Sequence, residues 1–387
     1  MDPIYLDYNA STPLAPEVVE AMQPFLKEDF GNPSSSHWAG KRAREVVETA
    51  RAEVAALVGA KPAEIIFTSG GSEANNHALK GIFFASRRRT PHIITTCIEH
   101  PAVLEPCRFL ERLGARVNRI PVDRAGLVDP DDVRRAITPD TILVSVMHAN
   151  NEVGTIEPIA SISQLTRERD IPFHTDAAQS AGKTPLNVNQ LGVDLLSVAG
   201  HKLYAPKGVG ALYVREGVAL ESLVHGAGHE SGRRAGTENV LLNIALGAAC
   251  RLARLDPCAA RLLELRDRFW QRLQDAFGAD VVLNGHPTER LPNTLNVSFP
   301  GYSAQQILEH LPWVAASTGS ACHAASPTMS PVLNAMGLEP RVGLGAIRFS
   351  VGRMTDSSQI DSVAESLKQI INTLTPEGRN SWVSRSS

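Results

Sequence analysis

The segment Ser197–Lys207, SVAGHKLYAPK, decides both the fold and the chemistry expected of this chain. The apolar run 194–199 that leads into it predicts a buried strand. Pro206 and Gly208 then exclude a helix and predict a loop. Lys202 would lie just after the carboxyl end of this buried strand. Desolvation there lowers the pKa of an amine and makes it a nucleophile suited to Schiff-base chemistry. A lone lysine after a strand is more often an exposed charge, so the choice depends on the rest of the chain.

On both sides of this segment, short apolar runs rich in β-branched residues alternate with helical patterns. Strand, helix and strand in this order predict an α/β fold with a large, mostly parallel, doubly wound sheet. Amphipathic patterning adds helices near residues 15–27 and 37–58. The predicted strands are Ile65–Thr68, His92–Thr96, Val117–Ile120, Thr141–Val146, Pro172–Thr175, Asp194–Val198 and Gly210–Val214.

The pattern changes near residue 254. A charged helix over 261–277 is followed by short strands with fewer helices between them, which predicts a smaller α+β domain. We expect residues 14–254 to form the large domain, 1–13 with 255–375 the small one, and 376–387 a disordered tail. The strands predicted here are Val281–Leu283, Asn293–Ser298, Trp313–Ala315 and Ala346–Ser350, before a last helix near 357–373.

Composition narrows the class of protein. The chain has 387 residues, 43% hydrophobic and 20% charged, which is typical of a globular protein. A net charge of -3 gives no electrostatic reason to expect a nucleic acid or a membrane as partner. The N-terminal residues have neither a basic nor an apolar leader pattern, so we expect a cytoplasmic protein. The five cysteines show no metal-ligand spacing, and we predict no metal site.

Polar residues follow several of the predicted strands. After Ile65–Thr68, the glycines of SGGS, including Gly71, would let a ligand approach the backbone, and Ser72 would cap the next helix and donate a hydrogen bond. A helix N-terminus favours an anion such as phosphate, although a plain capped turn fits equally well. His100 follows the next strand, as a structural residue or as a group that stacks on a ring.

The same edge of the sheet would carry Asp176 and Gln179. A carboxylate after a buried strand needs a partner, unless Asp176 is a simple helix cap. Pyridoxal 5'-phosphate requires such an acid beside its pyridine nitrogen. With Lys202 for the aldehyde, His100 for the ring face and the SGGS turn for the phosphate, every part of that cofactor has a partner. In doubly wound sheets, ligands bind at this edge.

The chain also resembles the cysteine desulfurases of the class V aminotransferase family, of the NifS-like kind, over nearly its whole length. The resemblance rests on YLDYNASTP, GNPSSSH, FTSGGSEANN, EHPAV, NNEVGTI, HTDAAQSAGK, GHKLYAPKGVGALYV, RRAGTEN, STGSACH and IRFSVGR. It implies a fold type I homodimer with active sites at the subunit interface, acting on L-cysteine and passing sulfur to an acceptor protein such as an iron–sulfur scaffold.

The resemblance further implies a role for each matching residue. Lys202 would form the Schiff base with the cofactor, and Cys322 would take the substrate sulfur as a persulfide. The other implied residues are His100 on the ring, Asp176 and Gln179 as ring contacts, Ser72 and His201 at the phosphate, Thr237 at the partner subunit's phosphate, and Asn151 with Arg348 on the substrate carboxylate.

Three alternatives stay open. The family often has serine three residues before the lysine, whereas this chain has Ala199, which with ACH at 321–323 is similar to selenocysteine lyases. An aminotransferase would need no Cys322. A non-catalytic sulfur-assembly partner would keep the fold without the chemistry.

Overall fold

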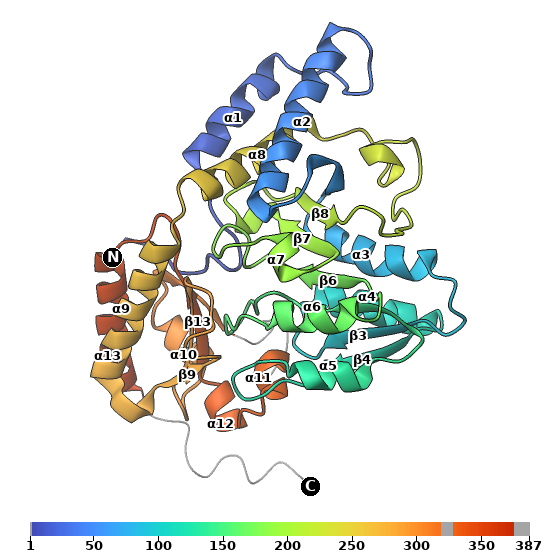
Figure 1. The fold of residues 1–387 in the computed structure, drawn as a ribbon. Coiled ribbons are helices and arrows are strands. Elements are labelled where there is room, and N and C mark those ends of the chain that lie inside the picture. Colours follow the sequence, from blue (N-terminus) through green and yellow to red (C-terminus); the bar gives the residue numbers. More distant parts are fainter. Residues whose placement is uncertain (1, 319–327, 375–387) are drawn as a thin grey trace.

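The computed structural model describes residues 2–318 and 328–374. Within them, the largest sheet has seven strands in the order β2-β8-β7-β6-β5-β3-β4 (Figure 1). Neighbours from β7 to β4 run parallel, and β8 is antiparallel to both β2 and β7. The strands are β2 (Ile65–Thr68), β3 (His92–Thr96), β4 (Arg116–Ile120), β5 (Thr141–Ser145), β6 (Phe173–Asp176), β7 (Leu195–Ala199) and β8 (Gly210–Val214). The predicted α/β class and mostly parallel sheet are confirmed.

Helices cover both faces of this sheet, and every residue of its central strands is therefore buried. Helices α3 and α4 pack on one face, and α2, α5, α6 and α8 contribute to the core on the other. The edge strand β4 differs because it carries exposed polar side chains, which protect a sheet edge from pairing. The helices are α1 (Pro16–Lys27), α2 (Trp38–Val58), α3 (Gly71–Ala85), α4 (Pro101–Arg112), α5 (Pro130–Ala136), α6 (Ile159–Arg167), α7 (Val188–Leu191) and α8 (Val240–Leu255).

The C-terminal part of the described chain forms an antiparallel sheet in the order β12-β13-β10-β9. Helices α9 and α13 pack against it around a separate apolar cluster that includes Phe269 and Phe349. Its elements are α9 (Ala259–Phe277), β9 (Val282–Asn284), β10 (Thr294–Ser298), α10 (Ala304–Glu309), β11 (Val314–Ala315), β12 (Ser317–Thr318), α11 (Pro331–Ala335), α12 (Pro340–Gly343), β13 (Ala346–Ser350) and α13 (Ser357–Thr373). We keep the domain division at residue 254 as a proposal; the expected tail, 376–387, lies outside the described residues.

The N-terminal segment joins the two sheets. Strand β1 (Ile4–Tyr5) pairs in parallel with β11, and Asp7 forms a bridge with Ser350, the last residue of β13. A few residues later, the Thr12 N–H donates to the carbonyl of His201, just after β7 (2.9 Å). Residues 6–12 therefore lie where the ends of the large sheet meet the smaller one.

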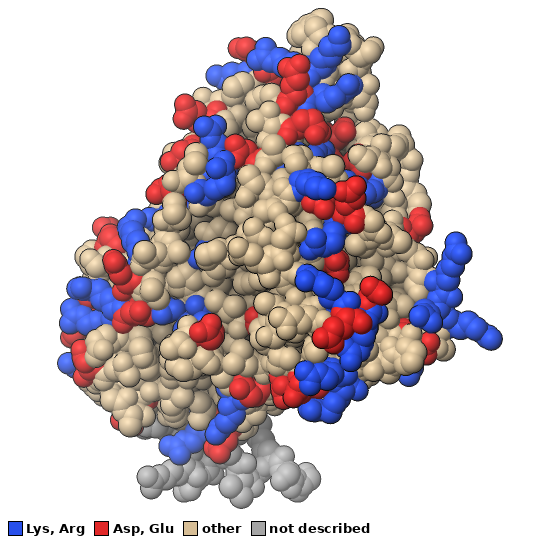
Figure 2. Space-filling view, viewed as in Figure 1, with Lys and Arg blue, Asp and Glu red and all other residues tan. Residues whose placement is uncertain are grey.

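The surface carries charges of both signs. Figure 2 shows Lys and Arg interspersed with Asp and Glu over the face it displays, which agrees with the small net charge of -3. Among the helices of the described residues, none combines the length and apolar character needed to cross a membrane.

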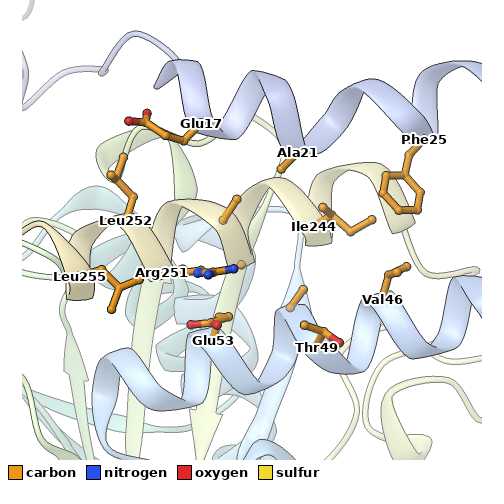
Figure 3. A pocket seen from close by; sticks show the side chains of 13 residues that line it. Glu17, Ala21, Phe25, Val46, Thr49, Glu53, Ile244, Arg251, Leu252 and Leu255 are labelled. Atoms are coloured by element: carbon orange, nitrogen blue, oxygen red, sulfur yellow. The ribbon is translucent and has the colours of Figure 1, made fainter.

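An apolar groove of about 470 Å³ lies between α1, α2 and α8, where Phe25, Val46 and Ile244 face one another (Figure 3). At its floor α8 crosses α2 closely. A Cβ added at Gly247 would lie 2.6 Å from Cα and 2.7 Å from Cβ of Ala50. Glycine at this crossing therefore lets the two helix backbones approach.

We expect Gly247→Ala to destabilise the fold by about 1–3 kcal/mol, because overpacking forces the backbone of α2 or α8 to move. The measurement is the denaturant midpoint of unfolding. Gly228→Ala is the control, since no described heavy atom lies within 4 Å of the added Cβ. Equal midpoints for the two variants would show that the crossing relaxes without cost.

Candidate active site

A cavity of about 620 Å³ opens at the carboxyl edge of the parallel strands. The turns after β2, β3, β6 and β7 line it, and so do the N-terminal segment and β13. The candidate site residues were predicted to follow these strands, because ligands bind at this edge of doubly wound sheets. The structure brings together Gly71, Ser72, His100, Asn151, Asp176, Gln179, His201, Lys202 and Arg348 around this one cavity.

The turn between β2 and α3 forms an open cradle. Gly70 is the N-cap of α3, has φ +149° and offers no capping side chain. A Cβ at Gly70 would meet no described heavy atom within 4 Å, whereas one at Gly71 would lie 3.1 Å from the Cβ of Ala199. The expectation that Ser72 caps the helix is wrong: α3 begins at Gly71, so Ser72 lies inside the first turn. The N–H groups of that turn favour an anion.

Lys202 ends the short 3₁₀ turn after β7. Its Nζ donates hydrogen bonds to the carbonyl oxygens of Asn9 and Ala10, the latter at 2.8 Å. Burial, and to a smaller extent the Arg348 cation, lower the pKa of Lys202 to about 8, although the carboxylates of Asp7 and Asp176 act in the opposite direction. More of the amine is therefore neutral near pH 7 than in an exposed lysine, which makes Lys202 a better nucleophile.

Asp176 is 6% exposed and is held from two sides. Its Oδ1 accepts from the Ala178 N–H (2.9 Å), and its Oδ2 accepts from Nδ2 of Asn75 on α3 (2.6 Å). Sequence reasoning missed Asn75. The available signal was its position four residues after Gly71, which puts both on one face of the helix. Asn75 therefore fixes the orientation of the carboxylate.

His100 is the N-cap of α4, and its Nδ1 accepts a hydrogen bond from the Ala102 N–H (3.0 Å). In the neutral ring, the hydrogen must then be on Nε2. Desolvation lowers the pKa of His100; the Asp176 carboxylate opposes this and the Lys202 cation adds to it. The structure thus presents a neutral imidazole at the cavity with one donor nitrogen.

Gln179 and the N-terminal segment meet beside Lys202. Gln179 Nε2 donates to the Asn9 carbonyl (3.1 Å), the same oxygen that accepts from Lys202. The Asn9 side chain is fully bonded as well: Nδ2 donates to Thr294 Oγ1 (2.8 Å), and Oδ1 accepts from Asn293 (2.9 Å). Asn9 therefore ties the lysine to the smaller sheet, a role that the sequence did not reveal.

Arg348 reaches the cavity from β13. Its Nη1 donates to the carbonyl of Asn151 (3.0 Å), and its Nη2 forms an ion pair with Asp7 Oδ1 (2.6 Å) and contacts Ser317 Oγ (3.0 Å). The guanidinium expected to bind a substrate carboxylate is thus held by a carboxylate of its own chain. Its Nε is buried and has no partner among the described residues, so this N–H is free to donate to a ligand.

The remaining candidates differ. Burial and the cations of Lys202 and Lys207 lower the pKa of His201 to about 4, so this imidazole offers hydrogen bonds rather than charge. Lys207, unassigned from the sequence, also lines the cavity. Thr237 is exposed and does not line the cavity of this single chain, and Cys322 lies outside the described residues.

Within residues 2–318 and 328–374, no group of His, Cys, Asp and Glu side chains has the arrangement of a metal site. The polar groups of the cavity instead comprise an amine, a fixed carboxylate, a neutral imidazole, a guanidinium and an anion cradle. This set can bind a phosphorylated aromatic aldehyde and an amino acid.

Residues 4–363 match the family model described as Aminotransferase class-V. The chain is 51% identical over 375 residues to cysteine desulfurase IscS of Dictyoglomus turgidum, covering 96% of this chain and 95% of that protein. A solved structure called NifS-like protein superposes with TM-score 0.90 at 35% identity over 96% of this chain and 100% of that one. Another, SspA in complex with cysteine, gives TM-score 0.81 at 38% identity over 90% and 98%. The resemblance stated above is confirmed, and this chain belongs to the class V aminotransferase family.

Proposed function

We propose that this protein is a pyridoxal 5'-phosphate-dependent cysteine desulfurase, which converts L-cysteine to L-alanine and transfers the sulfur to Cys322. One observation carries the proposal. The amine of Lys202, with its lowered pKa, shares a cavity with the fixed carboxylate of Asp176 and the guanidinium of Arg348. The match to proteins named cysteine desulfurase supports the choice of substrate.

The residues present fit pyridoxal 5'-phosphate. The space beside Gly70, which a Cβ would fill, and the N–H groups of α3 suit its phosphate. Asp176 suits its pyridine nitrogen, His100 its ring face, and Lys202 its aldehyde. When bound, the cofactor supplies an electron-accepting ring that stabilises negative charge at the substrate α-carbon.

The chain's own residues then have defined tasks. Arg348 and Asn151 hold the substrate carboxylate, and for this Arg348 must share or exchange its bond to Asp7. The Nζ of Lys202 is the base for the α-proton, with Nε2 of His100 as the second group within the cavity that can carry a proton.

Sulfur transfer is assigned to Cys322, in the segment outside the described residues. Its thiolate attacks the substrate sulfur, so that an S–S bond forms and the C–S bond breaks. The electron pair stays on the carbon, which takes a proton and becomes the methyl group of alanine. Cys322 is left as a persulfide.

We further propose that the protein works as a homodimer, with Thr237 reaching the partner subunit's phosphate. We also propose that the persulfide passes in the cytoplasm to an acceptor protein such as an iron–sulfur scaffold. The exposed position of Thr237 supports the first point. The name IscS carried by the relatives supports the assignment to sulfur delivery.

The test is alanine release from L-cysteine and, separately, from L-selenocysteine, by the wild type and by Cys322→Ala. We expect the wild type to release alanine from L-cysteine, and Cys322→Ala to lose this by about 10²-fold or more, because the attacking thiolate is missing. Full activity of Cys322→Ala on L-selenocysteine, with no wild-type activity on L-cysteine, would identify a selenocysteine lyase and refute the persulfide step.

A further inference from the structure

Lys183 is a buried lysine without an assigned role. It is 6% exposed and lies in the turn after β6, next to Gly182, whose φ is +70°. Within the described residues, no carboxylate forms an ion pair with its amine. Burying an unpaired amine costs stability, so a residue of this kind needs a reason in function or in packing.

Its hydrogen bond leads to the active site. Lys183 Nζ donates to Gln179 Oε1 (3.4 Å), and Gln179 Nε2 donates to the Asn9 carbonyl (3.1 Å). That carbonyl can only accept, so Nε2 must face it and Oε1 must face the lysine. The amide orientation is therefore determined from both ends. The same Asn9 oxygen accepts from Nζ of Lys202.

Among the residues that the structure describes, no carboxylate acts as a counter-charge to Lys183. Burial, with smaller contributions from the cations of Lys202 and Arg348, lowers the pKa of its amine to about 7, and Cys258 acts in the opposite direction. The gap that it borders holds about 10 Å³, too small for a cluster of water molecules. Groups facing this region from each neighbouring element are His201, Lys202 and Tyr204 after β7, Cys258 at α9, Arg348 on β13 and Arg353 after it.

We propose that Lys183 is a positioning residue: its amine fixes the Gln179 amide and, through the Asn9 carbonyl, the place of Lys202 Nζ. This inference rests on the proposed desulfurase function, in which Lys202 carries the reaction. Lys183 touches neither substrate nor cofactor in this scheme. It acts through the side chain of Gln179, the residue expected to contact the cofactor ring.

A positioning role predicts opposite effects on stability and on activity. The folded state disfavours the charged amine, whose pKa falls from 10.5 to about 7. Between these two values the unfolded chain binds more protons, so the penalty is complete below about pH 7 and disappears as pH rises towards 10.5. Lys183→Met removes the penalty but also removes the donor that orients Gln179.

The experiment compares the wild type with Lys183→Met, Gln179→Ala and the double variant. Ser180→Ala is the control, because it alters a fully buried polar side chain in the same turn without touching this chain of bonds. Readouts are Tm of the cofactor-free proteins at pH 7 and pH 10, binding of pyridoxal 5'-phosphate by absorbance, and kcat and KM for alanine release from L-cysteine.

We expect Lys183→Met to have a higher Tm than the wild type at pH 7, with a smaller difference at pH 10. Its kcat should fall about tenfold or more, with KM within about threefold, because misplacement of a reacting group slows chemistry more than binding. In the Gln179→Ala background, the same change should cost less than about twofold, since both act through one amide.

Provided that the wild type releases alanine from L-cysteine, three results would overturn the inference. They are an unchanged kcat in Lys183→Met, additive effects in the double variant, and a lower Tm or loss of folded protein in both Lys183→Met and Lys183→Leu. If the wild type itself releases no alanine from L-cysteine, the proposed function fails instead. The Tm comparison then still tests whether the buried amine destabilises the fold.

Discussion

Lys202→Ala is expected to lower kcat for alanine formation by at least about 10⁴-fold. The change removes both the amine that would form the Schiff base and the base that would take the α-proton. It also leaves the carbonyls of Asn9 and Ala10 without the donor that they share in the structure. The measurement is alanine release from L-cysteine at saturating substrate, together with the visible absorbance of the protein after addition of pyridoxal 5'-phosphate.

The matched control is Lys61→Ala. Lys61 pairs on the surface with Glu216, and both side chains are largely exposed, so its removal should leave kcat within about twofold. Equal activity of Lys202→Ala and the wild type would refute the assignment of Lys202. So would a Lys202→Ala protein that keeps the absorbance band of the wild type.

The second large effect is expected for Asp176→Asn. The substitution keeps the size of the side chain but removes the charge that would partner a protonated ring nitrogen in a buried site, which we expect to cost about 10²–10³-fold in kcat. It also forces a mismatch, because both oxygens of Asp176 now accept hydrogen bonds, from Ala178 N and Asn75 Nδ2. The measurement is kcat with excess cofactor, so that weaker binding is not mistaken for slower chemistry.

Asp194→Asn is the control for this prediction. Asp194 also lies beside β7 and accepts bonds from Phe173 N and Arg215, but it lies at the opposite end of the strand from the cavity. We expect its kcat to stay within about threefold of the wild type. Comparable losses of kcat in both variants would mean that any acid-to-amide change near this sheet impairs the protein. That result would refute the role proposed for Asp176.

The fold was largely predictable because each central strand is a short run, mostly apolar or β-branched, between helical patterns. The direction of β8 was not predicted, although a signal existed. Only residues 200–209 separate β7 from β8, too few for the helical crossover that a parallel neighbour requires. An antiparallel strand at this position could therefore have been derived from the connection length.

The candidate site was predictable wherever a residue ends or directly follows a strand of the large sheet, as Asp176, His100 and Lys202 do. Asp7 and Asn9 were missed because their partners lie far along the chain. Asp7 pairs with Arg348, and Asn9 bonds Asn293 and Thr294, contacts that no local pattern encodes.

The missed residues share a second property, which is that they act on other side chains. Asn75 holds Asp176, and Lys183 holds Gln179. A sequence pattern identifies groups whose chemistry suits a ligand, but it does not show which polar side chain lies behind them. Local structure was also mispredicted at Ser72. Gly70 is the N-cap of α3 instead, and this depends on how the turn after β2 packs.

The most direct test of the account is the mass of the peptide that carries Cys322 after the cofactor-loaded protein has reacted with L-cysteine in the absence of any acceptor thiol. We expect an increase by the mass of one sulfur atom on Cys322, together with one alanine released for each chain modified. Alanine release without added mass on Cys322, or added sulfur on another cysteine alone, would contradict it.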